Sequence, residues 1–196
     1  MVPAVRPAYR VYELTGEARW ITEATAADDA LLALFWDDED GGVFTVGRDG
    51  EQLIARQKDL LDGATPSASS FAAVGLAHLG AVTGVERYNR RAGAIVALLG
   101  VVAGDYPTSL GRLLGAVDHV VFGIDEVLIT GTRPDLVAAY RSQWRPRAVL
   151  AWGERFTSPL WEGRGEVGDD GRAYVCRNHT CGLPSATPDE LAERLR

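Results

Sequence analysis

Apolar residues recur at three- and four-residue steps through most of the first 120 positions, a pattern that predicts a succession of α-helices. The clearest series passes through Trp20, Leu31 and Phe35 and predicts a helix over residues 17–35, after a shorter helix that Gly16 ends. The same periodicity predicts three later helices, with apolar positions within residues 71–82, 88–99 and 110–117. Because short loops join these helices, they are expected to pair as helical hairpins.

A different pattern follows the helix that ends at Phe35. Two short β-branched runs, residues 43–46 and 52–54, flank the turn sequence Gly47–Gly50. Such an arrangement is typical of a small β-hairpin.

The pattern changes again after residue 120. Apolar runs of strand length alternate with a helical segment, and a capping box (Thr187, Glu190) begins a short C-terminal helix. The chain is therefore predicted to be mainly α, with helical hairpins over residues 1–120 and a C-terminal α/β appendage over residues 121–196. The strands and helix expected in the appendage are strand 126–131, helix 134–144 and strand 148–152, which form a β-α-β unit, and a further strand at 173–176.

Composition and charge exclude several classes of protein. The 196 residues suffice for one domain with its own core, and 20 basic against 27 acidic residues give a net charge of −7. Because this sign is wrong for a surface that follows phosphates, no nucleic-acid partner is expected. No apolar run approaches the roughly 18 residues of a membrane span, so we expect a soluble, cytoplasmic protein. A nucleotide-binding glycine motif and a complete set of metal ligands are also missing, so no cofactor and no metal are predicted.

Four consecutive acids, residues 37–40, form the first candidate site. Asp38 and Asp40, together with Asp62, are candidates for the paired carboxylates that acid/base chemistry on a sugar requires. The same acids suit a structural or ligand-binding role, or a solvated turn after the helix, where adjacent charges repel one another and the helix dipole.

The loop that follows carries the second candidate site. Arg56, Lys58, Asp62, Ser67 and Ser69 bring opposite charges and hydroxyls into one short segment, and they are predicted to contact a polar ligand. The alternative is local: Asp62 and Ser67 cap the loop and the next helix, and Arg56 or Lys58 forms a nearby ion pair.

The tail contains the only cysteines, Cys176 and Cys181, with His179 between them. They are candidates for redox-active or structural thiols, for a disulfide, or for metal binding, although one histidine and two cysteines do not complete a zinc site. A spacing of four lacks the Cys-x-x-Cys geometry that lowers a thiol pKa, which favours two partly buried structural thiols. His78 lies on an apolar helix face, where packing is expected, and His119 follows a helix end.

Four strings taken together resemble a known family. In their order and spacing they are similar to the C-terminal portion of the thioredoxin-domain-containing family that includes spermatogenesis-associated protein 20 and its bacterial relatives. The strings are FWDDEDGGVF (residues 35–44), RQKDLLDGATPSASS (56–70), the helical stretch 76–88 that contains a Thr-Gly turn, and AYVCRNHTCGLP (173–184).

This resemblance implies a fold. Family members look like a thioredoxin-like domain followed by an α/α toroid similar to those of N-acylglucosamine 2-epimerases and six-hairpin glycosidases. Residues 1–120 then correspond to a partial toroid. The thioredoxin-like domain and the first half of the ring are missing, which implies a truncated family member, a split gene product or one half of a two-chain assembly.

A partial ring leaves apolar flanks uncovered. At about 25 cal/mol per Å², a flank of several hundred Å² left in water forgoes roughly 10 kcal/mol. We therefore expect a partner: a thioredoxin-like chain, an N-terminal toroid chain, or a second copy in a homo-oligomer.

The resemblance also implies the functional hypotheses. The first is a cavity that binds a polar or carbohydrate-like ligand, with an epimerase- or glycosidase-like reaction if the acids at the mouth of the cavity are catalytic. The alternative is a non-catalytic scaffold or interaction module that partners a thioredoxin-like chain.

Overall fold

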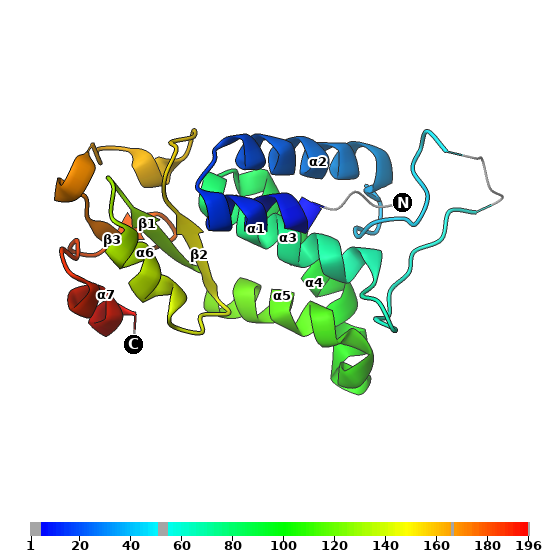
Figure 1. Ribbon diagram of the computed structural model, residues 1–196. Coiled ribbons are helices and arrows are strands. Elements are labelled where there is room, and N and C mark those ends of the chain that lie inside the picture. Colours follow the sequence, from blue (N-terminus) through cyan, green and yellow to red (C-terminus); the bar gives the residue numbers. More distant parts are fainter. Residues whose placement is uncertain (1–4, 51–54, 166, 196) are drawn as a thin grey trace.

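The computed structural model describes residues 5–50, 55–165 and 167–195, which are mainly α-helical with one small sheet, as the sequence predicts. Five helices come first and form the larger layer (Figure 1): α1 (Val5–Thr15), α2 (Arg19–Phe35), α3 (Ala68–Thr83), α4 (Glu86–Asp105) and α5 (Gly111–Phe122). The remaining elements are β1 (Asp125–Ile129), α6 (Pro134–Arg141), β2 (Ala148–Ala151), β3 (Ala173–Arg177), β4 (Thr180–Cys181) and α7 (Pro188–Arg194). Short 3-10 turns cover Pro107–Leu110, Pro159–Trp161 and Gly168–Asp170.

The helical layer is built around α3. Helix α1 pairs with α2 and α3 pairs with α4, which confirms the predicted hairpins, and α3 also contacts α1, α5 and β2. Every residue of α3 from Ala72 to Thr83 is buried, and most of them are small or aliphatic, so neighbouring elements approach on all sides. Gly84 ends the helix with a φ of +74°, as its position in the sequence predicts.

Helix α2 buries one acidic side chain. Asp28 lies on the same face as Ala24 and Leu31 and is 0% exposed. Neither of its carboxylate oxygens has a hydrogen-bond partner within the described residues. Burial, and then the charge of Asp29, raises the pKa of Asp28 from 3.8 to about 8, so this carboxyl is protonated in the folded chain at neutral pH.

The sheet has the strand order β2-β1-β3-β4. Strands β1 and β2 are parallel, with Glu126 opposite Val149, which confirms the predicted β-α-β unit, whereas β3 runs antiparallel to β1. Side chains alternate between two faces, so Leu128 joins the core shared with the helical layer and Val127 joins a smaller cluster with residues of α6 and α7. The sheet therefore lies between α6 and α7 on one side and the helical layer on the other (Figure 1).

Helix α1 covers the edge of the sheet at β2, where no further strand of the described residues pairs. A carboxylate oxygen of Glu13 accepts the Leu150 N–H at 2.9 Å and the Tyr9 hydroxyl proton at 2.5 Å. Tyr12 uses one hydroxyl oxygen twice, because it accepts the Trp152 N–H at 2.9 Å and donates to the Trp152 carbonyl at 2.7 Å. Two side chains of a helix thus satisfy backbone groups that a neighbouring strand would otherwise pair.

The predicted β-hairpin is wrong in its first strand. Residues 43–46 form no strand; Val43 makes a single bridge with Trp36, because the turn after α2 folds back onto the end of that helix. The second predicted strand, residues 52–54, lies outside the described residues. Helix α5 is also longer than predicted, so His119 lies within it instead of after its end.

None of the described helices combines the length and the apolar character needed to cross a bilayer.

Candidate functional site

An acidic hollow of about 730 Å³ lies on the connection between α2 and α3. Figure 1 places this connection at the end of the helical layer farthest from the sheet. The hollow combines aromatic side chains with charges of both signs and is lined by Trp36, Asp37, Asp38, Glu39, Asp40, Phe44, Arg48, Arg56, Lys58 and Leu60.

Asp37 and Lys58 form a partly buried ion pair in this hollow. Their charged atoms are 2.5 Å apart, and the Lys58 ammonium also donates to the Gly41 carbonyl at 2.7 Å. Asp37 in turn accepts the Glu39 N–H at 2.9 Å. The hydrogen bond from Lys58, and then the one from Glu39, lowers the pKa of Asp37, which stays ionised and holds the turn. Lys58, one of the predicted ligand residues, lines the hollow with its charge already paired, as the local alternative has it.

The two arginines of the hollow also donate hydrogen bonds to backbone carbonyls. Arg48 binds the carboxylate of Asp38 at 2.7 Å and donates to the carbonyl of Trp36. Arg56 donates to the Val46 carbonyl at 2.7 Å, and its guanidinium lies 4.0 Å from the centre of the Phe44 ring. The predicted residues Asp38 and Arg56 therefore meet at one site, where each has a protein partner.

Glu39 and Asp40 differ from these side chains. Both are exposed, and neither forms a side-chain hydrogen bond or an ion pair with another described residue. With respect to the described residues, they are the carboxylates of the hollow that a ligand can reach without displacing a protein partner.

The other predicted ligand residues do not line the hollow. Asp62 accepts the N–H of Ser67 at 2.8 Å and that of Arg112 at 2.7 Å, which ties the start of α3 to α5. Burial raises the pKa of Asp62, but these backbone N–H groups outweigh it, and the net pKa is lowered. Ser67 caps α3 by accepting the Ser70 N–H, and the buried hydroxyl of Ser69 accepts the Val43 N–H at 3.4 Å. Asp62 and Ser67 therefore cap the loop and the helix, which is one of the two alternatives. Because Asp62 does not line the hollow, it forms no acid pair with Asp38 or Asp40 there.

A disulfide joins Cys176 and Cys181 across β3 and β4. The sequence left structural or redox-active thiols, a disulfide and metal binding open, and the structure contains the disulfide. The favoured interpretation, two partly buried structural thiols, is corrected accordingly. The sequence concealed this pairing because the strands turn through only Asn178 and His179, both at positive φ, which brings the two cysteines directly opposite one another.

Sequence reasoning missed a second cavity, of about 440 Å³, between α3, α4, α5 and the turn that joins β3 to β4. Its polar lining includes Glu126, which is 3% exposed and accepts the His179 N–H at 2.8 Å, and His119, whose Nε2 lies 3.1 Å from the Pro146 carbonyl oxygen. Burial raises the pKa of Glu126 and lowers that of His119. The available signal was the alternation of β1, which places Glu126 on the same face as the core residue Leu128.

Comparisons with known proteins identify a relationship over most of the chain. No protein-family model matches it. Spermatogenesis-associated protein 20 from Homo sapiens is 28% identical over 97% of this chain, and the proteins of that name from Rattus norvegicus and Mus musculus are each 26% identical over the same share. The chain is therefore a distant homologue of these proteins over nearly its whole length, and it spans 26% of the length of each.

Proposed function

Starting from this homology with spermatogenesis-associated protein 20, we propose that the chain binds a polar, carbohydrate-like ligand in the acidic hollow. The observation that carries the proposal is the lining of that hollow, in which carboxylates that have no partner among the described residues lie close to aromatic side chains. Sugar rings present apolar C–H faces and many hydroxyl groups, so aromatic surface and unpaired oxygen acceptors suit them together.

The protein partners within the hollow support this division of roles. Asp37, Lys58, Arg48 and Arg56 hold the loop in shape, so the site is largely formed before a ligand arrives. Glu39 and Asp40 keep their acceptor capacity. Trp36 is 2% exposed, its carbonyl accepts a hydrogen bond from Arg48, and its indole N–H has no hydrogen-bond partner within the described residues. The aromatic surface within reach of a ligand is therefore mainly that of the half-buried Phe44.

The proposal extends to the architecture that the resemblance implies. The hairpins α1/α2 and α3/α4 would be consecutive units of an α/α toroid, and the acidic hollow would open at its mouth. A catalytic role is not included, because Asp62, the expected second carboxylate, does not line the hollow opposite Asp38 or Asp40.

Calorimetric titration with glucose, N-acetylglucosamine and glucosamine tests the ligand proposal. We expect at least one of these sugars to bind, and the double variant Glu39→Gln/Asp40→Asn to lose affinity by about tenfold or more, because hydrogen bonds to charged acceptors contribute about 1.5–3 kcal/mol each. The control is Asp49→Asn, which removes an exposed acid of the same connection that does not line the hollow. Absence of binding by all three sugars, or an equal loss in the control, would contradict the proposal.

An apolar surface on α5 favours the interaction module as a second candidate function. Four apolar side chains in its last three turns are exposed: Leu114, Val120, Val121 and Phe122. Phe122, the largest of them, is 59% exposed. Large apolar side chains gathered on one helix mark surfaces that partners cover. Under this proposal the partner is a second copy of the chain, an N-terminal toroid chain or a thioredoxin-like chain.

Sedimentation velocity tests the second copy. We expect association of the native chain at micromolar concentration and its loss in the variant Leu114→Ser/Phe122→Ser, because this variant removes apolar area from the surface on α5. Val101→Ser, which changes an exposed valine on α4, serves as the control and should leave association unchanged. A native chain that remains monomeric at high concentration would remove the homo-oligomer from this proposal.

A further inference from the structure

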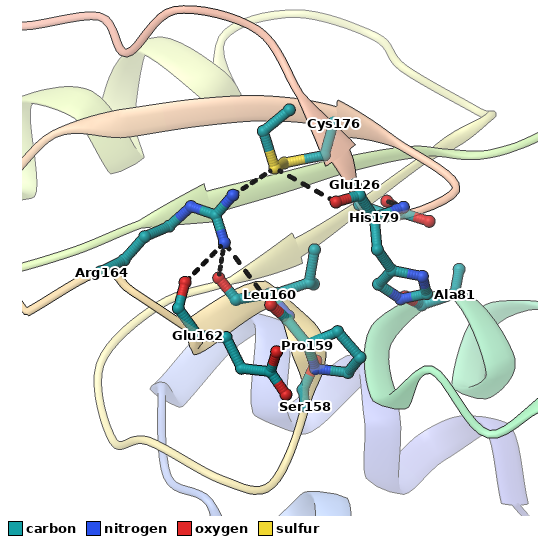
Figure 2. The surroundings of a disulfide bond; sticks show 10 residues. Ala81, Glu126, Ser158, Pro159, Leu160, Glu162, Arg164, Cys176 and His179 are labelled. Atoms are coloured by element: carbon teal, nitrogen blue, oxygen red, sulfur yellow. Dashed lines mark hydrogen bonds between the residues drawn. A yellow bond between two sulfur atoms is a disulfide. The ribbon is translucent and has the colours of Figure 1, made fainter.

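The disulfide occupies an unusual electrostatic position. Cys176 is 2% exposed, whereas Cys181, on the short strand β4, is partly exposed, so a reagent in solvent reaches the sulfur of Cys181 first. Figure 2 shows a guanidinium, that of Arg164, directed at the disulfide from the loop that follows β2. Its Nη2 lies 2.8 Å from the sulfur of Cys181.

Backbone groups hold Arg164 in this place. Nη1 donates to the carbonyls of Leu160 at 2.8 Å and Glu162 at 3.2 Å (Figure 2). The guanidinium also lies 4.9 Å from the centre of the Tyr174 ring. No carboxylate of the described residues forms an ion pair with Arg164. A positive charge that no acid of the described residues neutralises therefore adjoins one sulfur of the pair.

The other sulfur has the opposite surroundings. Cys176 pairs with Glu126 on the neighbouring strand, and the sheet pleat places both on the same buried face. A second anion beside a buried carboxyl is unfavourable, so a reduced pair carries its negative charge on Cys181 and keeps Cys176 as a neutral thiol.

We propose that Cys176–Cys181 is a thiol–disulfide exchange site, in which Arg164 stabilises the thiolate of Cys181 and the reductant is a small thiol of the glutathione class. The thiolate of the reductant attacks the sulfur of Cys181, and the bond to Cys176 breaks. Cys176 leaves with the electron pair and takes a proton from solvent. A second thiolate then attacks the sulfur of the reductant in the mixed disulfide, which releases Cys181 as a thiolate beside Arg164. Two thiols are oxidised to one disulfide, and the protein disulfide gains two electrons.

Equilibration of the full chain in glutathione redox buffers tests this proposal, with free thiols counted by alkylation and mass spectrometry. In Arg164→Met we expect the equilibrium constant to move about tenfold towards the disulfide, because the reduced form loses its charge-assisted contact. The matched control is Arg155→Met. Arg155 fastens the same loop through the carbonyls of Trp161 and Arg164 and lies over the Trp161 ring, but it does not contact sulfur.

Three results would overturn the proposal: equal shifts in both variants, no shift in Arg164→Met, or a disulfide that glutathione does not reduce while the chain stays folded. The last result would identify a purely structural bond.

A second measurement does not depend on the disulfide. In Cys176→Ser, the alkylation rate of Cys181 as a function of pH should report a thiol pKa below the ordinary value of about 8.5, and adding Arg164→Met should return it to that value. Near-ultraviolet circular dichroism checks that each variant keeps its tertiary packing. An ordinary thiol pKa with Arg164 present would refute the role of the arginine.

Discussion

Replacing Asp28 by asparagine is expected to stabilise the chain at neutral pH, by about 4 kcal/mol in the free energy of unfolding at pH 7. Burial raises the pKa of Asp28 to about 8, whereas the unfolded chain has the ordinary value of 3.8. Between these values the unfolded state releases a proton that the folded state retains. Stability is therefore fully present below about pH 4 and falls by up to about 1.4 kcal/mol per pH unit until about pH 8. Asparagine has no proton to release and removes this decline.

Urea unfolding at several pH values measures the effect. The curves of the native chain and Asp28→Asn should nearly coincide near pH 4 and diverge as the pH rises. Asp29→Asn is the control, because its carboxylate is partly exposed and accepts the hydroxyl proton of Tyr88 at 2.5 Å. It should keep most of the pH slope of the native chain. Parallel curves for the native chain and Asp28→Asn would show that Asp28 ionises normally.

The second large effect is expected at the edge of the sheet. Glu13→Ala should cost about 3 kcal/mol, because the buried Leu150 N–H and the Tyr9 hydroxyl lose their acceptor and Arg10 loses its ion-pair partner. Glu13→Gln keeps an oxygen that accepts the Leu150 N–H, so its cost should be smaller. Thermal unfolding at constant pH measures both.

Glu17→Ala provides the comparison for Glu13. Its side chain forms an exposed ion pair with Arg19 just after α1, and such pairs contribute about 0.2–1 kcal/mol. If Glu13→Ala costs no more than Glu17→Ala, the covering of the β2 edge does not depend on Glu13.

The sequence predicts local elements well because their causes are local. The apolar period through Leu31 and Phe35 fixes α2, and Gly84 ends α3 where its lack of a side chain permits a positive φ. Thr187 caps α7 by accepting the Glu190 N–H, as the capping box predicts. Each of these features depends on residues within a few positions of one another.

Several features that depend on distant residues are not apparent from the sequence. Strand β3 lies beside β1 although Ala173 and Ile129 are far apart in the sequence, and no local pattern encodes that neighbour. Asp62 caps the start of α3, as one of the two alternatives predicts, but its other oxygen accepts the Arg112 N–H at the start of α5, a contact that no local pattern indicates. Asp28 was overlooked for another reason. It lies on the apolar face of α2, and an acid in such a pattern is usually assumed to reach solvent.

The candidate site was predicted in part. Asp38, Asp40, Arg56 and Lys58 do line one hollow, because the turn after α2 folds back on the helix end. The aromatic lining by Phe44 is not apparent from the sequence, because residues 43–46 have the pattern of a strand in a hairpin.

The covering of β2 by α1 has a consequence for synthesis on the ribosome. A chain emerges from its N-terminal side, so α1, with its partner α2, leaves the exit tunnel long before residues 148–151 do. Helix α1 is therefore present in the nascent polypeptide before strand β2, whose edge it covers. As soon as β2 emerges, its unpaired backbone can dock on α1 of the same chain. This limits the time in which β2 can pair with a strand of another chain that a neighbouring ribosome is synthesising.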